Sequence, residues 1–394
     1  MKIVHLINLQ GFGGVEKRFV KYIKNSSYKN IVLCLSNSIN EHVASTLSGI
    51  AVYRVNRVFD AYEAKWPTFI RKYILNFKIN RFNADCVIVW DFVPKLFMKP
   101  KCKSFIYYDC GCGWRYALNN RTLGFLNMLD AIISNSHASK RVMQLKYSFK
   151  KKIFTVLNRL DMQPVTISKK IINKKHIVLG TASRLVGLKG ISISLLVLDE
   201  LKKRGINAKL FIAGSGNCEL QLKELASDLN IVDFVDFVGY QSDMKKFYEK
   251  IDVYMSTPVT EAFGLSCIEA LSNAVPVIFP LVDGQPEAIK DGYCGIGLKP
   301  TVSIDEHEKL AGIDIDFPHQ VYDPINDKLT EPKLLSHIDC ADAIERLLKE
   351  PSLYESMSKN AIEWSKESMN YEKFKNEFED AFRELAKSTL PRKS

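Results

Sequence analysis

The chain has 394 residues, and its 46% apolar content is enough to build two α/β domains, each with a core of its own. The longest apolar runs have the length of strands, so we expect no membrane-spanning helix. The first seven residues lack the layout of a signal peptide and are predicted to be a strand. The nine cysteines form no C-x-x-C pair and no histidine cluster has zinc spacing, so we expect free thiols in a cytoplasmic protein and no metal site. Cys34, Cys86 and Cys267 are expected in hydrophobic cores.

The net charge of +11 is distributed unevenly along the chain. Residues 1–175 hold 30 Lys and Arg against 9 Asp and Glu, whereas the remainder holds 25 against 35. A domain this basic attracts an anionic partner, which can be nucleic acid, an anionic membrane or an acidic acceptor. No nucleic-acid-binding module accompanies the charge, so we expect no nucleic-acid partner. An anionic membrane face or a lipid-linked acceptor is favoured, because each basic residue near anionic lipid contributes about 1 kcal/mol.

The first domain is predicted to span residues 1–165 as a doubly wound, Rossmann-like sheet. Gly13 and Gly14 lie between its first strand and a helical pattern, where glycine lets the backbone approach a ligand closely. Both are candidate ligand contacts, and a plain tight turn is the alternative. Lys17, beside them, is a candidate acceptor-binding residue. A dinucleotide-dependent oxidoreductase is disfavoured, because the glycine spacing departs from its fingerprint and no acid closes the next strand, 31–35.

Two further segments of the first domain carry candidate contacts to partners. The aromatic and basic stretch 66–78 fits an amphipathic helix that lies on a bilayer, and equally an ordinary helix packed on the sheet. A later strand runs into a glycine-rich loop, where Asp109, Cys110 and Arg115 are candidate acceptor-binding residues. His137 is expected to start the following helix rather than to act in catalysis.

In the second domain, an apolar strand at 177–180 is followed by Arg184 and Lys189, five positions apart between glycine-bearing turns. The guanidinium of Arg184 offers a fork of donors, and the ammonium of Lys189 offers a point charge. Together they can hold the two phosphates of a nucleotide.

Glu261 and Glu269 lie eight positions apart around Gly264, after another apolar strand. A loop is expected to carry Glu261, and a helix is expected to begin close to Gly264. Eight residues are a little over two helical turns, so both acids can lie along one line at the start of that helix. The helix N-terminus favours a diphosphate, and Glu269 can accept hydrogen bonds from a ribose diol. For the spacing alone, a capped helix with a solvated acid is the alternative.

Taken in order, these segments resemble the sugar-donor site of family 4 glycosyltransferases, which are retaining enzymes of the GT-B architecture with two facing Rossmann-like domains. The resemblance extends over 211–216, 237–240, 274–277 and 283–287. It implies transfer of a hexosyl group from a nucleotide-diphosphate sugar to a glycan or lipid-linked acceptor, with no cofactor. No Asp-x-Asp motif is expected in this chain, so metal-independent catalysis is favoured. It also implies a role in lipopolysaccharide, O-antigen or capsule biosynthesis, at the inner face of the cytoplasmic membrane.

The resemblance assigns a role to each site residue. Arg184 and Lys189 neutralise the diphosphate of the donor. Glu261 approaches the sugar hydroxyls as the third catalytic residue, and Glu269 holds the ribose. The base is expected near the turn at 214–216 and the segment 237–240. The other donor-site residues are Phe263, Gly264, Leu265, Gly214, Gly216, Gly13 and Gly14.

The chain departs from the family's pattern in the first domain and in the second. The family commonly has a histidine at the strand end before the glycine-rich loop, and the matching position here is Cys110, or Tyr108 after a slip. Within the second domain, 175–366, residues 301–342 hold 10 Asp and Glu against 3 Lys and Arg and are expected to be an inserted loop. Residues 367–394 are expected to form an amphipathic helix that crosses back to the first domain, and a tail.

Three alternatives share part of this pattern. A cytosolic enzyme of the same architecture that makes a soluble glycoside has the same donor site. A sugar-nucleotide epimerase of this architecture needs no acceptor. A non-catalytic, membrane-associated scaffold, suggested by the missing histidine, binds lipid and no nucleotide.

Overall fold

The computed structural model describes residues 1–11, 13–55, 57–58, 62–63, 68–111, 113–161, 170–172, 176–241, 243–317 and 320–388. Within them the chain forms two compact units. The first consists of Met1–Leu157 together with Glu372–Ser394, and the second of Asn158–Tyr371. The predicted domain boundary between 165 and 175 falls largely outside the described residues, as does the start of the predicted amphipathic stretch, Trp66 and Pro67.

The first unit is built around a seven-stranded sheet in which neighbouring strands are parallel. Its order is β3-β2-β1-β6-β7-β8-β9, so the winding reverses between β1 and β6, the kind of switch point at which doubly wound sheets bind ligands. The strands are β1 (Lys2–Ile7), β2 (Lys29–Cys34), β3 (Val52–Arg54), β6 (Cys86–Trp90), β7 (Ser104–Asp109), β8 (Ala131–Ser134) and β9 (Lys152–Thr155). A short antiparallel pair, β4 (Arg57–Val58) and β5 (Tyr62–Glu63), follows β3. The predicted Rossmann-like sheet is confirmed in this unit.

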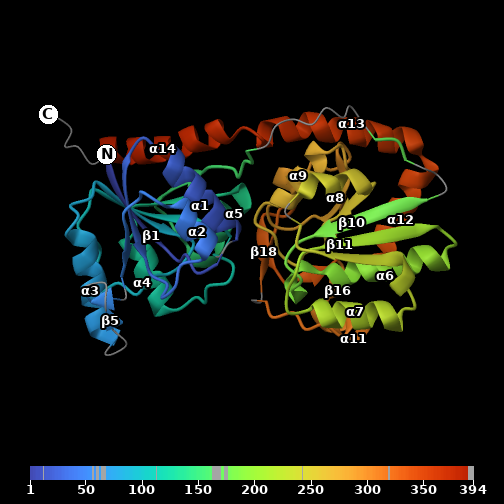
Figure 1. Cartoon of the computed structure of the whole chain (residues 1–394), viewed down its shortest axis with the longest axis horizontal. Helices are drawn as coiled ribbons and strands as arrows, with labels where there is room; N and C mark the ends of the chain where they lie inside the picture. Colours follow the sequence, from blue (N-terminus) through green and yellow to red (C-terminus); the bar gives the residue numbers. More distant parts are fainter. Residues whose placement is uncertain are drawn as a thin grey trace. The chain divides into compact units, whose positions relative to one another are not determined.

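Strand side chains alternate between the two faces of this sheet, and different helices cover each face. Val4 and Leu6 belong to one core together with buried residues of α3 (Thr68–Asn80), α4 (Asn120–Met128) and α5 (His137–Tyr147). His5 points to the opposite face and contacts Phe19 of α1 (Gly14–Asn25). A further helix, α2 (Glu41–Thr46), follows β2 (Figure 1). Helix α5 begins at His137, which confirms the predicted position of that residue.

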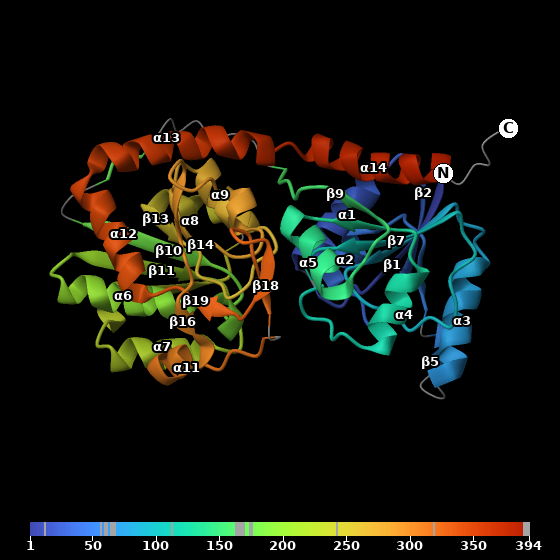
Figure 2. The ribbon, with the colours of Figure 1, turned by 180° about the vertical axis from the view of Figure 1, so that it is seen from behind.

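The last helix of the chain, α14 (Tyr371–Ser388), packs on the first unit through its aromatic stripe (Figure 2). The ring of Phe378 lies 4.9 Å from that of Tyr22 in α1. It also lies 5.6 Å from Trp90 and 5.0 Å from Tyr108, on the two neighbouring central strands. These rings are buried, so the predicted return of the C-terminal helix to the first domain is confirmed.

The second unit holds a six-stranded parallel sheet of order β12-β11-β10-β13-β14-β15, with its switch point between β10 and β13. The strands are β10 (Ile177–Ala182), β11 (Ala208–Ala213), β12 (Val235–Gly239), β13 (Val253–Met255), β14 (Val277–Pro280) and β15 (Gly295–Leu298). Helices α6 (Ile191–Lys203) and α7 (Glu219–Asp228) lie on one face, and α8 (Met244–Lys250) and α9 (Leu265–Ser272) on the other (Figures 1 and 2). Helix α12 (His337–Lys349) packs on α6, and α13 (Pro351–Ser368) packs on α9. The shorter elements are α10 (Gln285–Ala288) and the 3-10 turns η1 (Gly187–Lys189) and η2 (Val232–Phe234).

The prediction of an inserted loop at 301–342 is wrong, because this segment is largely structured. It contains β16 (Val302–Ser303), α11 (Ile304–Ala311), β17 (Val321–Asp323), β18 (Lys328–Thr330), β19 (Lys333–Leu334) and the start of α12. Ile313, Leu334 and Leu335 are buried in the same core as the second sheet. The strands escaped prediction because each has only two or three residues, too few to show a period.

Cys34, Cys86 and Cys267 are buried free thiols, as predicted. Burial raises the pKa of the Cys267 thiol to about 12, so this side chain stays protonated at neutral pH and packs as an apolar group. No helix in the described ranges has both the length and the apolarity to cross a membrane.

Two buried histidines predict a pH-dependent stability. Nε2 of His5 lies 2.9 Å from Oδ1 of Asn30, and Trp90 donates its indole N–H to Nδ1 of His5, so the ring is neutral with its proton on Nε2. Burial lowers the pKa of His5 to about 4, and burial with the nearby His337 lowers the pKa of His307 to about 4. Between pH 6.5 and 4 the unfolded chain therefore binds more protons than the folded chain. We therefore expect the free energy of unfolding to fall as the pH is lowered from 6.5 to 4, by about 2 to 3 kcal/mol per histidine.

Urea unfolding followed by circular dichroism at several pH values between 7 and 4 measures this slope. His307→Gln is expected to reduce it, because glutamine does not titrate, whereas the same change at the exposed His42 is the matched control. An unchanged slope in His307→Gln would contradict the assignment.

Candidate functional site

In the second unit, the two loops that follow the neighbouring strands β10 and β13 meet at the carboxyl edge of the sheet. The amide of Val259 donates to the carbonyl oxygen of Leu188 at 2.9 Å, and the Thr257 hydroxyl donates to that of Gly190 at 2.8 Å. Gly190 has φ +60° and precedes α6, and a Cβ on it would lie 2.0 Å from the Thr257 carbonyl oxygen. The turn after β10 is thus held against the loop that carries Glu261.

This arrangement brings together two of the predicted catalytic residues. Nζ of Lys189 lies 2.5 Å from Oε2 of Glu261, and both side chains are about one-fifth to one-quarter exposed. The lysine is therefore neutralised by the chain's own carboxylate and remains accessible from solvent. Arg184, the third predicted catalytic residue, is exposed in the same turn and forms no ion pair with a described carboxylate.

Asp283 fixes the loop that carries Glu261. The sequence analysis included it in the 283–287 segment of the resemblance but gave it no role. Its carboxylate is buried, and Oδ2 accepts hydrogen bonds from the Thr260 hydroxyl and from the amide of Glu261. Its Oδ1 accepts from the amide of Tyr322 in β17, at 2.8 Å. The structured segment 301–342 therefore supports the Glu261 loop through one carboxylate. Contacts between residues so far apart in sequence leave no periodic signal.

The chain between Glu261 and α9 offers unpaired backbone donors. The amides of Ala262, Phe263 and Gly264 donate to no acceptor in the described part of the chain. Gly264 has φ +97° and caps α9, which confirms the predicted helix start. Consecutive amides before a helix N-terminus favour an anion. We call these three amides together with Lys189 the anion cradle.

One detail of the predicted geometry is wrong. Glu261 lies in the loop before α9, as predicted, but the helix begins only at Leu265. Helical spacing therefore does not relate Glu261 to Glu269, and the expected alignment of the two acids is not formed by the helix. The two carboxylates have different partners instead. The hydroxyl of the buried Tyr248 in α8 lies 3.0 Å from Oε2 of Glu269 and 3.1 Å from the carbonyl oxygen of Ser266. Burial, and then the charge of Glu269, raise the pKa of Tyr248, so the hydroxyl stays protonated and can position Glu269.

The two glycines predicted at the donor base, Gly214 and Gly216, are required by backbone packing. A Cβ on Gly214, where φ is +125°, would lie 1.8 Å from the carbonyl oxygen of Ser183, and one on Gly216 would lie 2.2 Å from that of Leu185. The amide of Gly214 also donates to the carbonyl oxygen of Gly239 at 2.8 Å. These glycines bring the turns after β10, β11 and β12 together, whether or not a ligand contacts them.

The expectation that the chain has no Asp-x-Asp motif is wrong, because Asp314 and Asp316 form such a pair beside the Lys189 loop. Their side chains are exposed, and a Cβ on Gly187 would lie 2.1 Å from the carbonyl oxygen of Asp314. Within the described ranges, no group of three His, Cys, Asp or Glu side chains is arranged to hold a metal ion. Metal-independent catalysis remains a prediction.

In the first unit, Gly13 caps α1 and Gly14 is its first residue, and both are exposed, as a ligand contact requires. The carboxylate of Glu16 accepts a hydrogen bond from the amide of Gly13 at 2.9 Å, so the chain's own acid occupies one donor at this helix N-terminus. Lys17 and Arg115 are exposed and remain acceptor candidates.

The structure contradicts the predicted contact between Asp109 and the acceptor. Asp109 is fully buried, and its Oδ1 accepts from the amides of Gly111 and Gly113, so it shapes the loop after β7. Tyr108 is excluded as the position of the missing histidine, because it is buried and its hydroxyl accepts from the guanidinium of Arg18 at 3.0 Å. Cys110 is the partly exposed residue at this strand end.

Comparisons with known proteins relate the second unit to glycosyltransferases. Residues 163–311 match the model of the family described as glycosyl transferases group 1. An uncharacterized glycosyltransferase of Haemophilus influenzae is 31% identical over 212 residues, which are 53% of this chain and 58% of the relative. The chain thus spans little more than half the length of this relative, and the family match lies wholly within the second unit.

Solved structures support the fold of the whole chain. A glycosyltransferase from Rickettsia africae has a TM-score of 0.71 at 17% identity and covers 98% of both chains. HepE of Anabaena, in complex with UDP and glucose, has a TM-score of 0.68 at 14% identity and covers 97% of this chain and 99% of its own. Identities this low show the fold alone. The predicted GT-B architecture is confirmed.

Proposed function

We propose that this protein is a retaining glycosyltransferase of family 4, which transfers a hexosyl group from a nucleotide-diphosphate sugar to a glycan or lipid-linked acceptor. The anion cradle carries this proposal, because it places one cation and three unpaired amides at the carboxyl edge of a parallel sheet, where such folds bind ligands. The family match over 163–311 and the UDP and glucose held by the structurally similar HepE support it.

Donor binding would rearrange one contact in the cradle. The diphosphate competes with Glu261 for Lys189, and Arg184 adds a second charge from the exposed side of the same turn. The cations and the amides then stabilise the negative charge that develops on the leaving diphosphate. Glu261, released from Lys189, is free to turn to the sugar hydroxyls, and Glu269 holds the ribose in the orientation set by Tyr248.

The first unit would bind the acceptor and an anionic membrane. It holds 31 Lys and Arg against 13 Asp and Glu. Helix α3 packs Leu75 and Ile79 into the core, as expected for a helix on the sheet. Its outer face exposes Ile70, Tyr73 and Phe77 by 42%, 51% and 69%. A basic unit with an exposed apolar stripe favours peripheral association with the cytoplasmic membrane, and hence a role in lipopolysaccharide, O-antigen or capsule assembly.

Thermal unfolding in the presence of UDP, GDP, ADP, dTDP and CMP, and of their sugars, tests the donor site. A ligand at 100 times its Kd adds about 2.7 kcal/mol to the unfolding free energy. We expect one nucleotide to stabilise the wild type and to stabilise Glu269→Ala less. Glu219→Ala, which removes an acid of α7 paired with Lys223, is the matched control.

Two other outcomes point to different functions. If no nucleotide stabilises the folded protein, the transferase proposal fails and the membrane-associated scaffold is favoured. If the bound nucleotide sugar is converted to its epimer without any acceptor, the protein is a sugar-nucleotide epimerase of the same architecture.

A further inference from the structure

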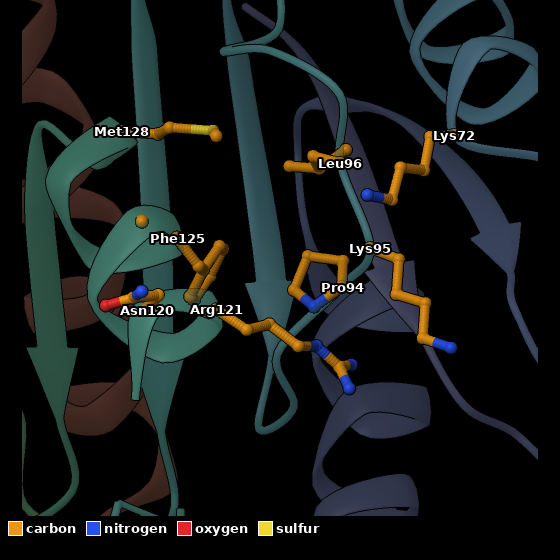
Figure 3. Close-up of a pocket in the computed structure, with 9 residues that line it drawn as sticks. Lys72, Pro94, Lys95, Leu96, Asn120, Arg121, Phe125 and Met128 are labelled. Carbon is orange, nitrogen blue, oxygen red and sulfur yellow. The ribbon is translucent and has the colours of Figure 1, made fainter. Parts of the chain in front are cut away.

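A basic cavity lies in the first unit, away from the residues that the sequence analysis selected (Figure 3). It has a volume of about 400 Å³ between α3, the loop after β6 and α4. Lys72, Lys95 and Arg121 supply its positive charges, and Leu96, Phe125 and Met128 form apolar walls. Figure 3 shows Arg121 extending from α4 toward Pro94 and Lys95, with Lys72 entering from the other side.

The cavity continues toward the carboxyl edge of the sheet. A second cavity, of about 220 Å³, shares Lys72, Lys95 and Arg121 and adds Arg71. It is also lined by Asn8 and Leu35, which directly follow β1 and β2. The four cations thus lie beside the strand ends at which doubly wound sheets bind their ligands.

Among the residues that the structure describes, no acid compensates the charges in this double cavity. No described Asp or Glu lines either cavity. Lys72 and Lys95 form no ion pair with the carboxylates that the structure describes. Two nearby lysines outside the cavity do form ion pairs, Lys99 with Asp130 and Lys103 with Asp85. Concentrated, uncompensated cations in a concave site with apolar walls focus a field that attracts an anion.

One of the cations is already held in place. The guanidinium of Arg121 donates to the carbonyl oxygen of Val93 at 2.8 Å, which fixes the side chain across the cavity. A guanidinium fork beside two ammonium groups suits the oxygens of a phosphate or diphosphate.

The rim of the cavity is apolar. Tyr73 and Phe97, which directly follow the lining residues Lys72 and Leu96, are exposed and stack with ring centroids 4.3 Å apart. Phe77, one helical turn beyond Tyr73, is also exposed. A cationic cavity beside exposed aromatic rings fits an amphiphile whose anionic head enters the cavity and whose alkyl chain lies along the rings.

We propose that this cavity binds the phosphate or diphosphate group of an amphiphilic acceptor. The inference rests on the proposed function, because it assigns the acceptor a chemical class and a site in the first unit. Lys95 and Arg121 are the residues that contact the phosphate oxygens, and Tyr73 and Phe97 contact the alkyl chain.

Calorimetric titration of the full chain with farnesyl diphosphate at low salt tests the proposal, with inorganic pyrophosphate and farnesol as the two partial probes. The double change Lys95→Ala with Arg121→Ala is expected to weaken farnesyl diphosphate binding by about 100-fold or more, since two charge-assisted contacts are lost. Lys95→Glu is a second variant that leaves the bond of Arg121 to Val93 intact. Lys99→Ala, in the same loop, is the matched control and should bind as the wild type does. Lys189→Ala should also retain binding, which separates this cavity from the anion cradle.

The proposal is overturned if the Lys95 and Arg121 variants bind farnesyl diphosphate as the wild type does. It is also overturned if, in Lys189→Ala, pyrophosphate or farnesol alone binds as tightly as farnesyl diphosphate, because the two parts of the amphiphile are then not both required. Nucleotide-induced stabilisation, measured on the same samples, separates this failure from that of the proposed function. Nucleotide binding without cavity binding removes the inference alone, whereas cavity binding without any nucleotide effect removes the transferase and leaves a lipid-phosphate site.

Discussion

Replacing Lys189 by alanine is expected to weaken binding of the nucleoside diphosphate by about 10- to 150-fold. A charge-assisted hydrogen bond to a phosphate contributes about 1.5 to 3 kcal/mol. The variant loses this contact, and it also leaves Glu261 without the partner that lies 2.5 Å away in the free protein. The remaining carboxylate then repels the diphosphate. Calorimetric titration with the nucleotide identified by thermal unfolding measures the loss.

Replacing Glu261 by glutamine is expected to have the opposite effect on this binding step. Lys189 is freed from its ion pair, so the diphosphate no longer competes with a carboxylate. Because a partly exposed ion pair contributes about 1 kcal/mol, affinity should stay equal to that of the wild type or rise by up to about fivefold. Sugar transfer should nevertheless fall, because the glutamine cannot place a negative charge at the sugar.

Lys366→Ala is the matched control for the Lys189 variant. It removes a lysine of the same unit that pairs with Glu363 on the surface of α13, so it makes the same change in charge. It should bind nucleotide as the wild type does. Equal affinity in Lys189→Ala and Lys366→Ala would mean that the diphosphate does not contact Lys189, and the cradle would lose its cation.

The sequence could predict those parts of the donor site that depend on local chemistry. A positive-φ glycine between an apolar strand and a helix marks a helix start, and Gly264 occupies that place with φ +97°. Lys189 and Glu261 were each selected from their own segments. Parallel strands have their carboxyl ends at one edge, which explains why two segments about 70 residues apart meet.

The sequence could not predict the residues that hold the site together from a distance. Asp283 fixes the Glu261 loop through contacts to Thr260 and Tyr322, and Tyr248 reaches Glu269 from another helix. Each contact depends on how separate elements pack, and neither residue belongs to a periodic pattern. Asp109 shows the opposite error, since a polar residue at a strand end was taken for a ligand contact although its carboxylate binds backbone amides in the interior.

The glycines of the two units differ in what their substitution can reveal. Gly13→Ala is compatible with the fold, because its φ is −92° and a Cβ would approach only the mobile end of Glu16, at 3.1 Å. A Cβ on Gly14 would meet no atom within 4 Å. Loss of ligand binding in either variant, in a protein of normal stability, would therefore indicate a direct ligand contact.

Gly214→Ala is expected to abolish folding of the second unit, at a cost of more than about 4 kcal/mol out of a total stability of about 5 to 15 kcal/mol. The added Cβ would lie 1.8 Å from the carbonyl oxygen of Ser183, and relief requires the turns after β10 and β11 to separate. That movement breaks the hydrogen bonds from Ser183 to Ala213 and from Gly214 to Gly239. Urea unfolding followed by circular dichroism measures the loss.

Gly205→Ala is the control that shows the cost of backbone strain without any steric overlap of the new Cβ. Gly205 also has a positive φ, +72°, but a Cβ there would meet no atom within 4 Å. It should cost only about 1 to 2 kcal/mol, the usual penalty for a non-glycine residue in the left-handed region. If Gly214→Ala were no worse than Gly205→Ala, the turns would be free to separate. A loss of nucleotide binding in Gly214→Ala would then report on ligand contact, as the sequence analysis assumed. If Gly214→Ala unfolds the unit as expected, such a loss says nothing about the ligand, and the case for the donor site depends on Lys189, Glu261 and Glu269.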